Sequence, residues 1–205
     1  MAKRVRAPSR FMLVAKNLAI DFANTVVDPR GEPAGAIRSW HDLIAFLEIA
    51  GSMPRDQSAR YREWARRDPR DCGATFALAL ELRDEIRKIL GALSGGTKVH
   101  GEWVQSINRV LVDQAGWKKL APVKGKWELT RVTEKESSSE LLLPIAESAA
   151  EIVSQGPDAH IRKCADPTCV LYFKDPAGRR RWCSMAICGN RAKVAAHAHR
   201  QKQSI

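Results

Sequence analysis

The sequence has no apolar run near the ~18 residues that a membrane-spanning helix needs. It also lacks a secretory signal, because the apolar run that starts at Phe11 stops at Lys16. No glycine-rich phosphate loop, Ser/His/Asp arrangement or supported carboxylate pair is present, and an array of aromatics for stacking single-stranded nucleic acid is missing. These absences exclude a transmembrane protein and predict a cytoplasmic protein that is not an enzyme.

Acidic residues are scarce at both ends of the chain. The 205 residues include 34 Lys+Arg and 23 Asp+Glu, a formal charge of +11. Residues 1–10 have four basic residues and no acid, residues 156–205 have ten basic and three acidic residues, and residues 11–155 are neutral. A basic surplus of this kind predicts a polyanionic partner. We therefore divide the chain into a basic arm (1–10), a neutral domain (11–155) and a basic C-terminal domain (156–205).

Hydrophobic periodicity predicts that the neutral domain is mostly helical. Alternating residues at 117–133 interrupt the helical pattern and predict one short antiparallel hairpin. After the boundary at Gly156-Pro157, a strand at 170–174, a turn at 175–178 and a return strand at 179–182 are expected. Helices are expected near 39–51, 55–68, 73–94, 101–115, 140–154 and 191–201.

The cysteines are unevenly placed, with Cys72 alone and four others within 25 residues. The spacing Cys164-x4-Cys169 and Cys183-x4-Cys188 brings two thiolate pairs together across a short insert, which suits one tetrahedral Zn²⁺. Four thiolates close the coordination shell, so the zinc is expected to be structural. Two disulfides, unrelated buried thiols, or replacement of one cysteine by a histidine are the alternatives; the candidate histidines are His160, His197 and His199.

Two motifs at opposite ends of the chain resemble one known pairing of domains. The segments 164–169, 180–185 and 188–193, with Trp-Cys followed by Cys-Gly-Asn-Arg, resemble the bacterial CGNR zinc finger. The segment 18–25, Leu-Ala-Ile-Asp-Phe-Ala-Asn-Thr, is similar to the signature that opens the ABATE domain, although Ile20 stands where that family more often has Leu. The resemblance implies a stress-response transcriptional regulator with a zinc-bound DNA-binding end.

The fold class that we expect is therefore α+β. A mostly helical N-terminal domain with one hairpin precedes a small finger of the treble-clef or zinc-ribbon kind, built from a knuckle, a hairpin and a helix. Trp182 is expected to form the small core of the finger. Of Tyr172 and Phe173, which alternate along one strand, one is expected to pack inward and the other to lie outside.

Basic residues around the second cysteine pair are candidate DNA-phosphate contacts, and binding is expected to depend on salt. The alternative role of these cations is to balance the negative zinc tetrathiolate, and Arg191 suits both roles. The basic arm is a candidate for minor-groove contact. The candidate nucleic-acid-binding residues are Arg179, Arg180, Arg181, Arg191, Lys193 and Arg200, followed by Lys202.

Asp21 and Asn24 are polar residues in an otherwise apolar stretch. They either cap the end of a local element or form the polar floor of an effector pocket, together with Arg38 or His41. Three functions stay open at this point. The first is a DNA-binding regulator with a sensing N-terminal domain. The second is a protein-interaction module whose finger is structural and binds no nucleic acid, and the third is a small-molecule-binding domain with residual catalysis.

Overall fold

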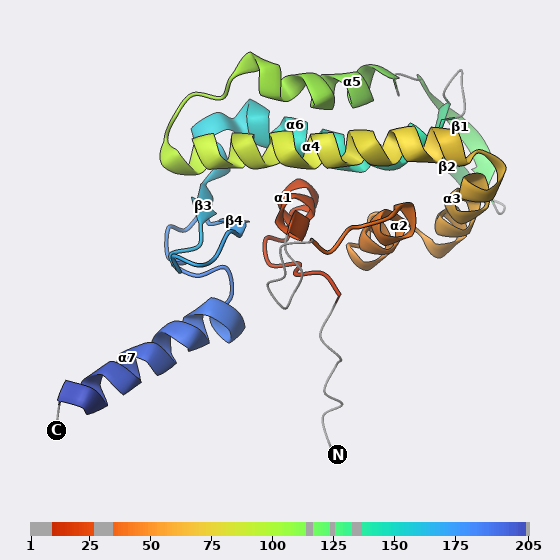
Figure 1. The fold of residues 1–205 in the computed structure, drawn as a ribbon. Coiled ribbons are helices and arrows are strands. Elements are labelled where there is room, and N and C mark those ends of the chain that lie inside the picture. The colour runs from red at the N-terminus through yellow and green to blue at the C-terminus, as the bar shows by residue number, and fades with distance from the viewer. Residues whose placement is uncertain (1–9, 27–34, 114–116, 124–125, 133–136, 204–205) are drawn as a thin grey trace.

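Helix α4 (Pro69–Gly95) is the central element of the structure, a computed structural model that describes residues 10–26, 35–113, 117–123, 126–132 and 137–203. Figure 1 shows α5 on one side of α4 and the shorter helices α1 to α3 on the other, with α6 lying along it. The other helices of this domain are α1 (Leu18–Ala23), α2 (Trp40–Ile49), α3 (Arg55–Arg67), α5 (Gln105–Asp113) and α6 (Leu143–Gln155).

Capping residues determine where α4 begins and ends. The Asp68 side chain accepts a hydrogen bond from the Asp71 amide at 3.0 Å, and Pro69 occupies the first turn, where its missing N–H costs nothing. Gly96, with φ +69°, ends the helix in the left-handed conformation that glycine adopts most easily. The helix therefore starts four residues before the expected position, because the Asp-Pro signal precedes the apolar periodicity.

The other predicted helices of the domain are confirmed. At the start of α2, Ser39 accepts a hydrogen bond from the Asp42 amide at 3.2 Å, whereas the Asp42 carboxylate accepts from the Arg38 amide and from the Arg10 side chain. Arg10 is the last residue of the predicted basic arm, and residues 1–9 lie outside the described residues. Pro144 lies in the first turn of α6, as expected.

The predicted hairpin at 117–133 is also present. Strands β1 (Trp117–Val123) and β2 (Lys126–Val132) pair antiparallel, with Leu120 opposite Leu129 and Pro122 opposite Trp127. In Figure 1 this hairpin lies at the end of the helical domain where α4 begins. Among the described residues, no helix is both long and apolar enough to cross a membrane.

The C-terminal region follows a different strand pairing from the one expected. Strand β4 (Tyr172–Lys174) pairs antiparallel with β3 (Ile161–Lys163), which precedes the first cysteine, and the expected return strand at 179–182 is not a strand. The reason is Asp175, whose carboxylate accepts hydrogen bonds from the Arg179 and Arg180 amides at 3.2 and 3.0 Å and so turns the chain away from β4. Helix α7 (Asn190–Gln203) confirms the last predicted helix.

The prediction that one of Tyr172 and Phe173 lies outside is wrong, because both side chains are buried. Tyr172 faces the helical domain, where the guanidinium of Arg87 on α4 lies 5.4 Å from its ring centroid. Phe173 lies under the guanidinium of Arg180, 4.2 Å from its ring centroid. Strand β4 therefore lies between the helical domain and the cysteine cluster, and one continuous core includes both.

Candidate metal centre

The two cysteine pairs come together at the end of the β3–β4 hairpin. Cys164 directly follows β3, Cys169 closes the turn before β4, and Cys183 and Cys188 arrive from the segment that leads into α7. All four Sγ atoms lie within 4.8 Å of one another. The Cys169 and Cys183 sulfurs are 3.8 Å apart, and those of Cys183 and Cys188 are 3.6 Å apart.

This geometry fits one tetrahedral zinc ion. Zn–S bonds of about 2.3 Å place the sulfurs of a tetrahedron about 3.8 Å apart, which matches the observed separations. The separations are far longer than the ~2.05 Å of a disulfide, so the disulfide alternative does not describe this arrangement. The chain therefore has a site for one structural Zn²⁺, with Cys164, Cys169, Cys183 and Cys188 as its ligands. Four protein ligands leave no position for a reactive water.

The electrostatics of the cluster require a cation if all four thiols are to ionise. Burial, followed by the charge of the neighbouring Cys169 sulfur, raises the pKa of Cys183 to about 12. Burial and the adjacent sulfurs raise the pKa of Cys188 as well. Bound zinc removes this penalty, because it offsets the thiolate charges directly. The Cys183 amide also points at the Cys164 sulfur, at 3.3 Å, and supports its negative charge.

Among the described residues, no histidine replaces a cysteine in the metal-binding cluster. His160 and His197 are exposed and lie outside the cluster, and the side chain of His199 is outside the described residues. His160 instead ends the short helical turn before β3 with a φ of +51°.

The glycine of the Cys-Gly-Asn-Arg segment is explained by packing. A Cβ atom on Gly189 would lie 2.7 Å from the Met185 Sδ and 3.3 Å from the Trp182 Cδ1. Trp182, which was expected to form the small core of the finger, is half-buried and packs against the edge of the buried core. Gly189 therefore leaves room for the Met185 side chain, and for the Trp182 ring next to it, beside the last zinc ligand.

Two of the candidate DNA-contacting arginines hold the metal region together. The guanidinium of Arg180 covers Phe173 and donates to the Val14 carbonyl at 3.3 Å, which links the finger to the start of the helical domain. Arg191, in the first turn of α7, donates to Asp166 at 3.3 Å and to the Thr168 hydroxyl at 3.2 Å, both between the first two cysteines.

The other candidate cations lie on the surface. Arg179 and Lys193 are exposed, and their side chains form no ion pair within the described part of the chain. Arg181 is exposed and lies 5.3 Å from the Trp182 ring centroid. Arg200 is exposed near the end of α7. The structure thus separates Arg180 and Arg191, which bond to the metal region, from Arg179 and Lys193, whose exposed side chains form no ion pair among the described residues.

Asn24, a candidate ligand-binding residue, instead connects the two domains. Its side-chain nitrogen donates to the Tyr172 carbonyl and its side-chain oxygen accepts from the Tyr172 amide, both at 2.9 Å. Arg87 reinforces this contact by donating to the carbonyls of Ala23 and Val170 at 3.2 and 3.3 Å. Sequence reasoning missed Arg87, because an arginine on a long helix carries no local sign that its partners lie in another domain.

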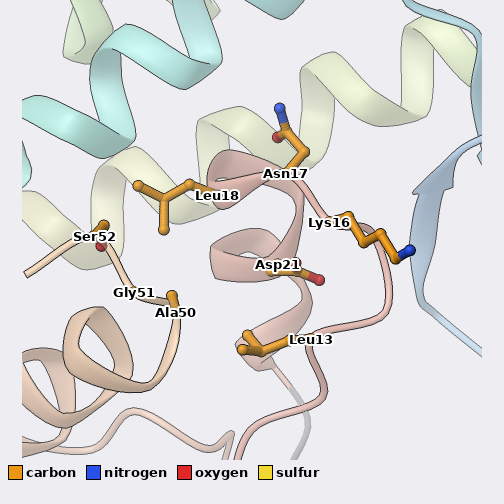
Figure 2. Close-up of a pocket in the computed structure, with 8 residues that line it drawn as sticks. All are labelled: Leu13, Lys16, Asn17, Leu18, Asp21, Ala50, Gly51 and Ser52. Carbon is orange, nitrogen blue, oxygen red and sulfur yellow. The ribbon is translucent and has the colours of Figure 1, made fainter.

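Asp21 and Arg38 lie apart from Asn24. The Asp21 carboxylate accepts hydrogen bonds from the backbone of the preceding loop, including the Ala15 amide at 2.9 Å, and burial raises its pKa to about 6. It lines a cavity of about 360 Å³ between α1 and the end of α2. Figure 2 shows its carboxylate directed away from Ala50 and Ser52 on the opposite wall. Arg38 donates to the Gly35 carbonyl and does not line the cavity, and His41 is exposed on α2.

Family comparison decides the identity of both regions. A profile of the ABATE family, described as "Putative stress-induced transcription regulator", matches residues 16–156. The chain belongs to the ABATE family. The CGNR zinc finger profile matches residues 160–201, which include the four zinc ligands. The comparison with curated proteins gives no match. In this ABATE protein, Asn24 of the opening signature is therefore one of the residues that join the ABATE domain to the CGNR finger, together with Arg87 and Arg180.

Proposed function

We propose that this ABATE-family protein is a cytoplasmic, DNA-binding transcription regulator in which α7 contacts DNA. The observation that carries the proposal is the exposure of α7. Figure 1 shows this helix projecting away from the rest of the protein, and its described side chains are exposed apart from Ala192. The helix contains no acidic residue, and its basic residues are Arg191, Lys193, Arg200 and Lys202.

The geometry of α7 suits a nucleic-acid groove. The major groove of DNA is wide enough to admit one α-helix, and phosphates flank the groove on both sides. Zinc would hold the beginning of α7 in place, because the helix starts two residues after Cys188. The proposal assigns binding to this region and no catalytic step.

Salt-dependent binding of duplex DNA tests the proposal. Fluorescence anisotropy with the zinc-loaded full chain is expected to show binding at ~50 mM salt that weakens steeply toward ~200 mM salt. The double variant Arg179→Glu/Lys193→Glu should bind at least tenfold more weakly, with a salt slope reduced by about 2. The matched control is Arg67→Glu/Arg70→Glu, which makes the same charge change at exposed positions near the α3–α4 junction. Arg180 is a poor test residue, because its loss would also disturb Phe173.

The competing function is a protein-interaction module with a purely structural finger. The observation in its favour is the broad contact between the finger and the ABATE domain through Asn24, Arg87 and Arg180. No DNA affinity at ~50 mM salt would decide for this alternative. Selection of bound genomic fragments by the purified protein would then measure sequence preference if DNA is bound.

The cavity beside Asp21 supports a sensing role for the ABATE domain. Its volume of about 360 Å³ is within the range of small-ligand sites, and the 13–18 segment forms one wall. The same segment contains Val14, whose carbonyl accepts the hydrogen bond from Arg180 of the finger. A ligand that moves this wall would therefore move a residue that is bonded to the finger.

Filling the cavity tests this connection without an identified effector. Ala50→Phe places a ring at a lining position and should change DNA affinity at least threefold. Ile49→Phe is the control, because Ile49 is exposed on the same helix and does not line the cavity. Equal DNA affinities for the wild type and both variants, at equal stability, would argue against an effector site here.

A further inference from the structure

The β1–β2 hairpin has one face made of exposed apolar residues. Leu120 and Leu129 are 64% and 62% exposed and lie opposite each other in the register. Trp127, 72% exposed, lies opposite Pro122, which is also exposed. Since side chains two residues apart on a strand share a face, these two pairs are neighbours on one side of the hairpin. We call these residues, Leu120, Pro122, Trp127 and Leu129, the hairpin face.

Such a face is costly to leave in water. A two-stranded hairpin has little stability of its own, and an apolar surface rimmed by polar groups is typical of a protein contact site. The ribbon consists of two strands about 5 Å apart, so its face is about 10 Å wide. That width matches the diameter of one α-helix.

The hairpin is also strongly basic, although the domain around it is neutral. Residues 117–132 contain five Lys/Arg and one acid, Glu128. Lys126 is exposed at the turn end of β2, on the side of the hairpin opposite Trp127, whereas Lys118 pairs with Arg131 two positions from Leu120 and Leu129. An occupant of the hairpin face must therefore bring both apolar and acidic groups.

We propose that the hairpin face binds an acidic amphipathic helix of a partner protein. The apolar stripe of such a helix covers the leucines and Trp127, and its acidic flanks complement the basic charge of residues 117–132. A second copy of this chain is disfavoured, because it brings two equally basic ribbons together. Nucleic acid is disfavoured as well, because phosphates would lie against leucine and proline side chains.

The hairpin face lies far from the helix proposed to contact DNA. Figure 1 shows the hairpin near the beginning of α4 and the finger near its end. With 27 residues, α4 is about 40 Å long, so a partner protein and DNA can be bound at the same time. The inference extends the proposed regulator by a protein partner, but peptide binding at the hairpin does not depend on DNA binding.

Peptide binding by the zinc-loaded full chain tests the inference. The probe is a fluorescent synthetic helix with a leucine stripe and glutamates on its flanks, and the reference is the same peptide with lysines in place of the glutamates. Anisotropy should show binding of the acidic peptide only, weakened by added salt. Leu120→Ser/Leu129→Ser should reduce the affinity at least tenfold, whereas Ile49→Ser, at an exposed isoleucine on α2, should leave it unchanged.

A second variant controls for the case in which the leucine substitutions reduce binding by unfolding the hairpin. Arg131→Glu keeps the hairpin face and reverses one charge of the pair that follows Leu120 and Leu129 in the register, so it should weaken binding of the acidic peptide and improve binding of the lysine peptide. Equal binding of both peptides, or acidic-peptide binding that Leu120→Ser/Leu129→Ser leaves intact, would overturn the proposal. It would also be overturned if the leucine variant converts a dimer into a monomer, or removes binding to duplex DNA or to anionic vesicles. Loss of DNA binding in Arg179→Glu/Lys193→Glu, with peptide binding intact, bears only on the proposed function.

Discussion

Asn24 gives the β4 backbone the same pair of hydrogen bonds that a neighbouring strand would supply. Its amide group donates to and accepts from Tyr172 across 148 positions of sequence, and the side chain is only 2% exposed. An asparagine side chain has one donor and one acceptor group in the geometry of a peptide bond, so it suits this role where aspartate does not. At the residue scale, one amide thus supplies two of the hydrogen bonds between the domains, beside those of Arg87 and Arg180.

Replacing Asn24 by aspartate should lower the stability of the whole chain. The variant removes the donor to the Tyr172 carbonyl and places a carboxylate against that carbonyl in a buried site, which we expect to cost about 1–3 kcal/mol. Thermal unfolding followed by circular dichroism measures the loss. Asn108→Asp, at an exposed position on α5, is the matched control. A melting temperature equal to that of the control would contradict the assigned role.

Asp21 should make stability depend on pH in the direction opposite to that of most carboxylates. Burial raises the pKa of Asp21 from 3.8 to about 6 in the folded protein, so the folded chain binds this proton more tightly than the unfolded chain does. The stabilisation that comes from this tighter proton binding is therefore fully present below about pH 4 and is lost as the pH rises through 6. The free energy of unfolding changes by about 3 kcal/mol between these limits.

Denaturant unfolding of the wild type and Asp21→Asn measures this effect. Between pH 5 and pH 7 the stability of the wild type should fall relative to that of the variant, because the amide does not titrate. The comparison between the two proteins removes the contributions of other groups, such as Asp42, whose pKa is lowered although its burial opposes the shift. Parallel stability curves for the two proteins would show that Asp21 does not titrate in this range.

The segment between β4 and Cys183 shows how one side chain decides the path of an element. Asp175 is buried, and its carboxylate accepts from two successive amides and lies 3.5 Å from the Arg162 guanidinium. The chain then crosses to the first cysteine loop, where the Arg181 carbonyl accepts from the Ala165 amide at 2.9 Å. The element that follows β4 is therefore a tight turn that delivers Cys183 to the metal site.

Asp175→Ala should loosen the metal site without removing a ligand. The variant leaves the Arg179 and Arg180 amides without their acceptor, which we expect to cost about 1–3 kcal/mol. Zinc transfer to a coloured chelator should become faster, while the zinc content at saturation stays at one per chain. Asp158→Ala, at an exposed acid before β3, is the control. Unchanged transfer kinetics in Asp175→Ala would show that the turn does not hold the ligands.

At the scale of the whole molecule, the finger and the ABATE domain share one core. Phe22 of α1, Leu82 of α4 and Phe173 of β4 belong to the same buried cluster as the zinc ligands. Helix α7 leaves this core directly after the last ligand. The finger is therefore built as an extension of the ABATE domain, with one projecting helix.

Removing zinc should consequently destabilise the ABATE domain as well as the finger. Chelation of the metal should lower the melting temperature of the main helical transition, because zinc binds only the folded state and β4 connects the site to α1 and α4. Circular dichroism with and without chelator measures the shift. Cys183→Ser should reproduce it and lose the metal, whereas Cys72→Ala should keep one zinc per chain, since Cys72 lies on α4 away from the cluster. An unchanged helical transition after zinc loss would show that the two regions unfold independently.

The sequence alone determined the features that depend on local order. Apolar periodicity and caps located every α-helix except the short α1, and the alternation at 117–133 located the hairpin. The spacing of Cys164, Cys169, Cys183 and Cys188 identified the zinc ligands. Each of these signals lies within one turn, one strand pair or one short loop, so it can be recognised without knowledge of distant residues.

Only the tertiary structure decided what the polar and charged residues of this chain do. From the sequence, Asn24 was a candidate ligand-binding residue, whereas in the structure it hydrogen-bonds to the Tyr172 backbone. Arg180 could not be distinguished from Arg179 in the sequence, but in the structure its guanidinium covers Phe173 and donates to the Val14 carbonyl. The pairing of β4 with β3 was likewise hidden, because Asp175 competes with the nearer return strand through hydrogen bonds that periodicity does not encode. The physical reason is the same in each case, because a polar or charged group bonds to whichever partner the folded chain brings near it. Here that partner can be far away in the sequence, as Val14 is 166 positions from Arg180.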